Sequence, residues 1–431
     1  MVRRAGGRSQ SRFDHPVEEE LLRAEEAAAL LGVKRATLYT YVSRGLVRCV
    51  PEKGTKENRY LRADVERLKT RHDARAGHAA VASGALRWGE PVIDSSVSRI
   101  SEEGLSYRGH DAVELATQGH RFEDVAELLW TGHLPLESTT WPAPEAPQSS
   151  LTPTSLAAML PRDTPPLSSL AALVPLLAAS DAGRFAAPVE QDMLRARRLI
   201  RHLGAWVCVA QAPGRVSRAL KEPTVADSLA TAWDAKPKRT AELINLALVL
   251  CADHELNTST FAARVTASSG ADLYACISAA LAAISGHRHG GACDRVEALI
   301  AEVGRPERAA QVVHGRLRRG EAVTGFGHRL YLKGDPRTPP LVAAALSVKP
   351  EAPKVRVARA VMDTMRDAGH PPPSLDWGLV MLADALGLPS GAATVLFSLG
   401  RTAGWVAHVL EQREQGHLLR PRARYVEAPA R

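Results

Sequence analysis

Apolar residues near the start of the chain recur at helical spacing in a first short segment. Residues 22–33 (LRAEEAAALLGV) predict an amphipathic helix that turns Leu30 and Leu31 inward. Gly32 follows these leucines directly, and a glycine just after the last apolar position is typical of a helix end. The chain therefore begins, after its first twenty residues, with a short helix.

A second helix and a hairpin follow at once. Residues 34–47 (KRATLYTYVSRGLV) place Leu38 on an inward face and end at Gly45. Residues 46–61 predict two strands around a Pro/Gly turn, and Asp64 is expected to cap a last short helix, DVERLK.

This order of elements over residues 21–70 predicts a small winged helix-turn-helix domain, and it resembles the MerR/excisionase type. In such a domain the second helix enters the major groove and the wing meets a phosphate. The alternative is a helical accessory module whose basic face is only solvated and which has no DNA function. The candidate DNA contacts are Lys34, Arg35, Thr37, Tyr39 and Tyr41 on the second helix and Arg59 on the wing.

The pattern of the remaining chain is helical nearly throughout, as in EDVAELLWTGHL and DLYACISAALAAISG. Residues 1–20 are expected to be a flexible N-terminus, residues 71–87 a linker of small residues, and residues 88–431 one large domain. Inside that domain, residues 139–167 are rich in Pro, Ser and Thr, which predicts an irregular connection.

Composition and charge support two modules with different partners. Hydrophobic residues make up 45% of the 431 residues and aromatic ones only 5%, which favours helices packed through small side chains. Residues 1–87 hold 18 Lys and Arg against 11 Asp and Glu, whereas the rest of the chain holds 37 against 36. Because the basic excess lies in the N-terminal fifth, an anionic partner such as DNA is expected there.

The cysteines and the hydropathy pattern indicate a cytoplasmic protein with no membrane partner. The five cysteines are scattered and form no CxxC pair, which is typical of buried thiols in a reducing compartment. No apolar run approaches the length of a membrane span, and the basic N-terminus lacks the apolar core of a secretory signal.

Polar residues that are able to do chemistry gather in six short segments of the large domain. An HxH pair at His287 and His289 invites a metal interpretation, but no Cys, Asp or Glu stands nearby at a zinc-like spacing, so no metal is expected. Each segment alone is a weak signal. The segments are 251–265 (CADHELNTSTFAARV), 284–296 (ISGHRHGGACDRV), 323–337 (VTGFGHRLYLKGDPR), 374–389 (SLDWGLVMLADALGLP), 398–412 (SLGRTAGWVAHVLEQ) and 418–425 (LLRPRARY).

In this order the segments resemble the citrate synthase family, and the opening stretch at residues 100–135 resembles it too. The resemblance covers roughly residues 88–425. It implies an all-α fold, with a large helical domain and a smaller one that closes over the substrates, and a homodimer. With the N-terminal module, the expected fold class is all-α citrate synthase-like preceded by a small winged helix-turn-helix domain.

The family's reaction condenses an acyl-CoA thioester with a 2-oxo acid. It requires a carboxylate that removes a proton next to the thioester carbonyl, and donors that stabilise the developing oxyanions. The resemblance implies that Asp376 is this base, that His289 donates to the thioester oxygen, and that His328 polarises the oxo-acid carbonyl. A neutral imidazole at position 289 is the sensible donor, and an apolar site favours it.

The resemblance also implies the binding residues. His254, Arg337 and Arg401 are expected to hold the dicarboxylate, because the guanidinium fork matches a carboxylate. Arg420 is expected to reach the same ligand across the dimer. Gly325, Gly327 and Lys333 are the candidate contacts to CoA, which enters as a co-substrate, so no tightly bound cofactor is expected.

Three positions depart from the family pattern but leave each proton-transfer group in place. Cys293 stands where the family usually has Asn after HGGA, and Ser374 precedes the Leu-Asp pair where Asn is common. Leu332 occupies a position often held by Lys or Arg, with Lys333 one step on. These changes bear on acyl-chain selectivity and CoA affinity.

The expected function is therefore the condensation of acetyl-CoA with oxaloacetate and water to citrate and CoA, as in the tricarboxylic acid cycle. Propionyl-CoA as the donor, which gives 2-methylcitrate, is one alternative, because an extra methylene changes pocket binding by only about 1–3 kcal/mol. A DNA-binding regulator with a synthase-like, metabolite-sensing body is the other.

Overall fold

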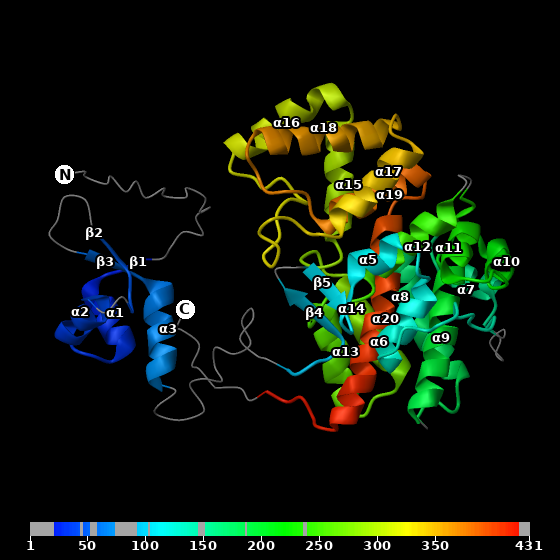
Figure 1. Cartoon of the computed structure of the whole chain (residues 1–431), viewed down its shortest axis with the longest axis horizontal. Coiled ribbons are helices and arrows are strands. Elements are labelled where there is room, and N and C mark those ends of the chain that lie inside the picture. Colours follow the sequence, from blue (N-terminus) through cyan, green and yellow to red (C-terminus); the bar gives the residue numbers. More distant parts are fainter. Residues whose placement is uncertain are drawn as a thin grey trace, which may run out of the picture. The chain divides into compact units, whose positions relative to one another are not determined.

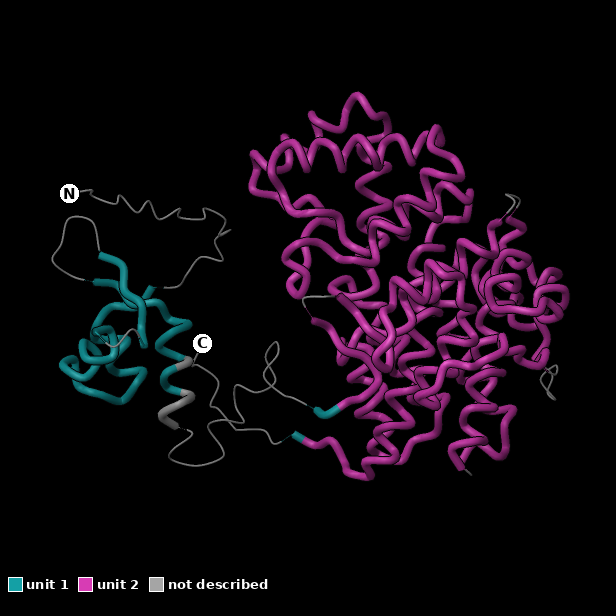
Figure 2. Tube along the Cα trace, viewed as in Figure 1, with its two compact units in different colours: residues 1–94, 421–431 teal, residues 95–420 magenta. Residues whose placement is uncertain are grey.

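The computed structural model forms two compact units (Figures 1 and 2), residues 1–94 with 421–431 and residues 95–420. The N-terminus predicted over 1–20, most of the linker predicted over 71–87, and Gly45 lie outside the described residues. The structure describes residues 21–43, 46–51, 58–73, 93–101, 104–144, 151–185, 188–235 and 239–421.

The first unit contains the predicted pair of helices and the hairpin. Helix α1 (Ala24–Leu31) ends at Gly32 in a left-handed conformation (φ 66°), and α2 (Arg35–Ser43) follows it. Strands β2 (Cys49–Pro51) and β3 (Asn58–Leu61) pair antiparallel. This confirms the helix-turn-helix and hairpin expected from the sequence.

Two details of the first unit differ from the prediction. A two-residue strand, β1 (Leu21–Leu22), adds to the far side of β3 and gives the sheet order β1-β3-β2. The last helix, α3 (Arg62–Asp73), begins two residues before Asp64, so Asp64 is not its cap. The carboxylate of Asp64 instead accepts hydrogen bonds from the backbone N–H and the guanidinium of Arg48.

The second unit opens with a small antiparallel sheet that the sequence did not indicate. Its strands are β4 (Ser98–Ser101), β5 (Gly104–Tyr107) and β6 (His110–Asp111), in that order. The rest of the unit is helical, which confirms the mainly α fold predicted for it.

Two groups of helices make up this unit (Figure 1). Helices α15 to α19 pack mainly on one another, and the other helices form the larger group. The larger group consists of α5 (Ala112–Thr117), α6 (Phe122–Thr131), α7 (Pro153–Met159), α8 (Pro166–Ser180), α9 (Val189–Trp206), α10 (Val216–Ala219), α11 (Val225–Trp233), α12 (Thr240–Cys251), α13 (Thr258–Ser268), α14 (Leu273–Ile284) and α20 (Ala392–Gln415). The smaller group consists of α15 (Ala292–Val303), α16 (Ala309–Arg318), α17 (Thr338–Val348), α18 (Pro353–Asp367) and α19 (Leu375–Leu386).

Helix α7 corrects the prediction of an irregular connection over 139–167. Thr152 caps it by accepting a hydrogen bond from the backbone N–H of Ser155, and Pro153 takes the first helical position. Proline and threonine are breakers inside a helix but good starting residues, so a Pro-rich segment can still begin one.

Helix α20 lies at the centre of the larger group and touches α6, α8, α9, α12, α13 and α14. Small residues allow this close packing: a Cβ on Gly400 would lie 2.7 Å from the carbonyl oxygen of Leu248, and the Gly404 N–H donates to the carbonyl of Ala252 at 2.9 Å. The end of α12 is therefore held against the middle of α20.

The thiols are unpaired, as expected: Cys49 is half-buried, and Cys208, Cys251, Cys276 and Cys293 are buried. Within the described ranges, the helices lack the combination of length and apolar character that crossing a membrane requires.

Candidate functional site

Most of the predicted site residues lie at the ends of helices in the second unit. His254 follows the end of α12, His289 follows α14, and Arg337 immediately precedes α17. Asp376 stands in the first turn of α19, and Arg401 is inside α20. Helix ends from both groups of helices thus supply the site.

His254 and His328 lie together around a tyrosine. Their ring centroids are 5.6 Å apart, and the Tyr331 ring is 5.6 Å from His254 and 4.8 Å from His328. The hydroxyl of Tyr331 is 3.1 Å from Nε2 of His254. Two segments that are 74 positions apart in sequence therefore meet here.

Strand β4 holds the loop that carries His254. The hydroxyl of Ser98 donates to the carboxylate of Asp253 and accepts the backbone N–H of Glu255 at 3.0 Å. The carboxylate of Glu255 accepts the N–H of Ile100 at 2.9 Å, and Glu255 has a positive φ of 51°. An unusual backbone conformation beside His254 is thus fixed from both sides.

The tautomer of His328 follows from its own loop. The backbone N–H of Leu330 donates to Nδ1 of His328 at 3.1 Å, so the neutral ring carries its proton on Nε2. Burial lowers the pKa of His328, and the charge of Asp335 offsets this only in part. His328 is therefore a neutral N–H donor at pH 7.

Two buried guanidinium groups each keep an N–H without a partner among the described residues. Arg337 donates to Asp335 through Nε at 2.9 Å and Nη2 at 2.7 Å, and Arg401 donates through Nε to the carbonyl of Cys251 at 2.9 Å. In both arginines Nη1 is buried and unpartnered. Buried donors are rarely left unpaired in a folded protein, so these two N–H groups are available to an anionic ligand.

The charges of both arginines converge on His254. Burial lowers the pKa of His254 well below its usual range, and the charges of Arg337 and Arg401 lower it further. Together these residues form a neutral imidazole beside two cations, which suits a ligand with more than one carboxylate.

His289 contacts Ser259 in the first turn of α13. Its Nε2 is 2.8 Å from the hydroxyl of Ser259, which also accepts the indole N–H of Trp405 at 3.2 Å. Burial and the charge of Arg401 lower the pKa of His289 to about 4. When the Ser259 hydroxyl donates to Nε2, the neutral ring carries its proton on Nδ1 and can donate it to a ligand.

Asp376 accepts one hydrogen bond on each carboxylate oxygen. The thiol of Cys293 lies 3.3 Å from Oδ1, and the hydroxyl of Ser374 lies 3.1 Å from Oδ2. Desolvation raises the pKa of Asp376, and these two hydrogen bonds limit the rise. A desolvated carboxylate is the form in which an aspartate is a stronger base.

The glycine loop predicted to contact CoA pairs with the segment before α19. The carbonyl of Gly325 accepts the N–H of Ser374 at 2.8 Å, and the N–H of Gly327 donates to the carbonyl of Pro372 at 2.8 Å. The Gly327 amide is thus already engaged within the protein. A Cβ on Gly325, where φ is 87°, would lie 2.8 Å from a methyl of Val296, so glycine is needed for packing.

Lys333 and Arg420 lie on the surface. Lys333 is exposed, and Leu332 beside it is 87% exposed. Arg420 is exposed at the end of the described C-terminal segment. The structure therefore places neither cation within the cluster around His254.

Sequence reasoning missed Asn257, Ser259 and Tyr331. Asn257 caps α13 by accepting the backbone N–H groups of Ser259 and Thr260 at 3.1 Å, while its own Nδ2 is buried and unpartnered among the described residues. Its place immediately before a helical run in ELNTST was the available signal. For Tyr331 the only signal in the sequence was that it lies three positions after His328.

The HxH pair splits between two environments. His287 is exposed, whereas His289 is half-buried and contacts Ser259. Across the part of the chain that the structure describes, no group of three or more His, Cys, Asp or Glu side chains could hold a metal ion.

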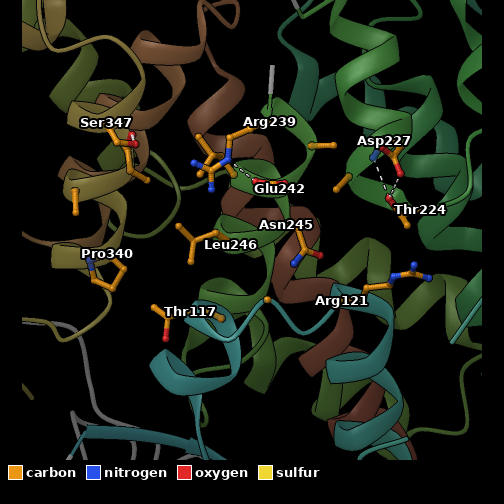
Figure 3. A pocket seen from close by; sticks show the side chains of 17 residues that line it. Thr117, Arg121, Thr224, Asp227, Arg239, Glu242, Asn245, Leu246, Pro340 and Ser347 are labelled. Atoms are coloured by element: carbon orange, nitrogen blue, oxygen red, sulfur yellow. Dashed lines mark hydrogen bonds and ion pairs between the residues drawn. The ribbon is translucent and has the colours of Figure 1, made fainter. Parts of the chain in front are cut away.

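A pocket of about 670 Å³ lies apart from these residues, between α5, α11, α12 and α17 (Figure 3). It is lined by Arg121, Asn245, Leu246 and Pro340, among others, and by none of the predicted site residues. Arg239 in its wall pairs with Glu242 at 2.6 Å. The residues that line this pocket are therefore distinct from those of the histidine cluster.

In the first unit, α2 presents only part of the predicted DNA-contact set to solvent. Lys34, Arg35 and Tyr39 are exposed, with Arg35 paired to Glu25 at 2.8 Å. Tyr41 packs against the unit's hydrophobic core. Thr37 and Arg59 are half-buried, and the exposed face includes three residues that the prediction omitted: Ala36, Thr40 and Ser43.

Comparison with known sequences identifies both parts of the chain. Residues 85–422 match the family described as "Citrate synthase, C-terminal domain", and residues 21–73 match "Helix-turn-helix domain". Citrate synthase 2 of Bacillus subtilis is 30% identical over 78% of this chain and 94% of its own length. The 2-methylcitrate synthase 2 of Corynebacterium glutamicum is also 30% identical, over 77% of this chain and 91% of its own.

Solved structures agree with the sequence comparison. Citrate synthase from Thermotoga maritima superposes with a TM-score of 0.66 at 27% identity, over 79% of this chain and 95% of that one. The Thermoplasma acidophilum enzyme, in ternary complex with carboxymethyl coenzyme A and oxaloacetate, gives 0.68 at 27% identity, over 80% and 96%. The chain is therefore a member of the citrate synthase family, an enzyme of that type carrying an N-terminal helix-turn-helix domain.

Proposed function

We propose that this protein condenses acetyl-CoA with oxaloacetate and water to give citrate and CoA. The observation that carries the proposal is the pair of unpartnered, buried N–H groups on Arg337 and Arg401, whose charges both act on neutral His254. A dicarboxylate satisfies both donors at once, and oxaloacetate is the dicarboxylate held by the Thermoplasma relative.

The first step forms a nucleophile from the thioester. Asp376 removes a proton from the carbon next to the thioester carbonyl, and its raised pKa makes it a stronger base for this transfer. His289 donates from Nδ1 to the thioester oxygen, where negative charge develops. Its low pKa keeps the ring neutral, so the donor is an imidazole and not an imidazolium.

The second step joins the two substrates. The enol carbon attacks the keto carbon of oxaloacetate, and His328 donates from Nε2 to the keto oxygen as it becomes an alcohol. Arg337 and Arg401 hold the carboxylates in register with that oxygen. Water then hydrolyses the thioester and releases CoA.

An acyl-CoA panel with oxaloacetate tests the proposal. Release of CoA by the purified full chain is expected to have its highest kcat/KM with acetyl-CoA, and a higher value with propionyl-CoA would make the enzyme a 2-methylcitrate synthase. Asp376→Asn serves as the control and should lose about 10²- to 10⁴-fold in kcat. A folded wild-type protein with no turnover above background would exclude both reactions.

We also propose that the enzyme is a homodimer in which Arg420 of one protomer completes the partner's site. Arg420 is a cation at the position expected from the family pattern, and it is exposed at the end of its own protomer. Exposure is what a residue that acts across an interface requires.

A DNA-binding role for residues 21–73 is the second proposal. The match to a helix-turn-helix family supports it, as do the exposed Lys34 directly before α2 and the exposed Arg35 and Tyr39 on α2. The full chain should retain the DNA upstream of its own reading frame better than random DNA, with a salt-dependent affinity. Lys34→Ala should weaken this retention and Lys354→Ala, which removes an equal charge on α18, should not; equal retention of random DNA would contradict specific recognition.

A further inference from the structure

The carboxylate of Asp376 is held by two side chains that belong to different segments. Cys293 lies in the first turn of α15, and its thiol approaches Oδ1 at 3.3 Å. Ser374 stands directly before α19, and its hydroxyl approaches Oδ2 at 3.1 Å. Each oxygen of the proposed base thus has one donor.

Both donors are fixed by the backbone around them. Cys293 is fully buried, and it follows a turn at Gly290 where a Cβ would collide with the backbone of Ile284. Ser374 is 7% exposed, and its N–H donates to the carbonyl of Gly325 at 2.8 Å. The carboxylate plane is therefore set by the helix that follows His289 and by the loop that leads to His328.

We propose that Cys293 and Ser374 are positioning residues that orient the Asp376 carboxylate and set how tightly it holds a proton, an inference that rests on the proposed function of Asp376 as the base. A thiol is a weak hydrogen-bond donor compared with a hydroxyl or an amide. We call Cys293 and Ser374 together the carboxylate clamp. This clamp restrains the Asp376 carboxylate without strongly stabilising its charged form.

The thiol acts in its neutral state. Burial raises the pKa of Cys293 well above its usual range, and the nearby Asp376 raises it further. The S–H bond is thus retained at neutral pH, and Cys293 functions as a donor and not as a nucleophile.

The two positions are also where this sequence departs from the family pattern. Asn is usual at both, and here the chain has a thiol and a hydroxyl. A thiol and a hydroxyl are thus the side-chain donors to the Asp376 carboxylate in this chain.

The pH dependence of kcat tests the clamp. A substitution that strengthens a donor to Asp376 and one that removes a donor should move the acidic limb of the kcat profile in opposite directions. Cys293→Ser offers a stronger donor, so the acidic limb should move to lower pH, with kcat down about three- to tenfold. Cys293→Ala and Ser374→Ala remove a donor, so the limb should move to higher pH. The KM for acetyl-CoA should stay within about twofold, since neither side chain is placed in CoA binding.

A buried cysteine elsewhere provides the matched control. Cys276→Ala, inside α14, removes a thiol of equal burial without contact to Asp376 and should leave the limb in place. The proposal is overturned if Cys293→Ser and Cys293→Ala move the limb in the same direction, or if neither moves it. Thermal unfolding of each variant separates a loss of fold from a shift of the base.

Failure of the clamp and failure of the proposed function are distinguishable. If wild-type protein turns over no acyl-CoA, the proposed reaction fails while the clamp is tested directly by ¹³C NMR titration of the aspartate carboxyls, assigned with Asp376→Asn. The Asp376 signal should then titrate at lower pH in Cys293→Ser and at higher pH in Cys293→Ala. An unchanged titration would refute the clamp.

Discussion

At the scale of single residues, the site depends on donors whose charge and geometry are set by burial. Arg401 shows this most clearly: it is 1% exposed, one N–H is satisfied by the carbonyl of Cys251, and Nη1 is unpartnered. The cost of burying this cation is offset when a carboxylate binds. Ligand binding and the stability of the site are therefore coupled.

Arg401→Lys should accordingly weaken oxaloacetate binding about 10- to 100-fold, because lysine keeps the charge but lacks the planar fork and loses one charge-assisted hydrogen bond of about 1.5–3 kcal/mol. Calorimetric titration with oxaloacetate measures the effect. Arg121→Lys, in the separate pocket of Figure 3, is the control and should bind oxaloacetate as the wild type does. Equal effects of the two changes would place the ligand elsewhere.

A buried histidine outside the site predicts how stability changes with acid. His202 in α9 is 6% exposed, and burial lowers its pKa to about 4. The unfolded chain takes up this proton near pH 6.5 and the folded protein only near pH 4, so stability falls as the pH drops through that window.

His202→Phe removes this titration. The decrease in the free energy of unfolding between pH 6.5 and pH 4 should therefore become smaller by on the order of 2–3 kcal/mol. Urea unfolding at pH 6.5 and at pH 4.5 measures it. The wild-type protein, unfolded at the same two pH values, is the comparison. A steeper loss in His202→Phe than in wild type would show that the sign is wrong.

At the scale of elements, the loop that carries His328 depends on the glycine at position 325. In Gly325→Ala the new Cβ would stand on a residue with positive φ and 2.8 Å from a methyl of Val296. The free energy of unfolding should fall by about 1–2 kcal/mol because of the backbone conformation and by about 1–3 kcal/mol more because of the contact. The displaced loop carries His328, so kcat should fall as well.

Gly369→Ala isolates the backbone part of that cost. Gly369 has a positive φ of 72° after α18 and nothing within 4 Å of an added Cβ. It should lose only the backbone portion of the stability and keep kcat. Chemical unfolding and steady-state kinetics of both variants provide the measurement; matching kcat losses would mean that the Val296 contact is irrelevant to His328.

At this scale, some helices and strands could be predicted from the sequence and others could not. Long helices such as α9 and α20 were predictable because their apolar positions repeat over several turns. Strands of two to four residues, such as β1 and β4, carry too few positions for a period to show. The half-buried position of Tyr41 against the core was not visible in the sequence because the short α2 has a weak amphipathic pattern.

The motif residues of the candidate site could be predicted from the sequence, but their hydrogen-bond partners could not. Motif order placed His254 and His328 in one site, and the structure brings their rings within 5.6 Å. The partners of those residues were not visible, because a hydrogen bond such as that from Cys293 to Asp376 joins positions 83 apart in the chain. Such contacts depend on how helices pack, which no local pattern encodes.

At the scale of the whole molecule, the remaining question is whether one protomer is sufficient. The described residues supply the proposed base, three imidazoles and two buried guanidinium groups from a single chain, while Arg420 stays exposed at its end. This exposed position is what the proposed sharing of a site between two protomers of a symmetric dimer requires of Arg420.

Complementation between two inactive variants decides this. Asp376→Asn lacks the base and Arg420→Ala lacks the exposed cation, so each homodimer should be severely impaired. In a mixed dimer with Arg420 acting across the interface, one site has both defects and the other has neither. Co-expression with two different tags, followed by purification on both, should therefore restore about half of the wild-type kcat per dimer. If Arg420 serves its own chain, each site keeps one defect and the mixed dimer stays as inactive as its parents, so recovered activity distinguishes the two arrangements without any structure of the complex.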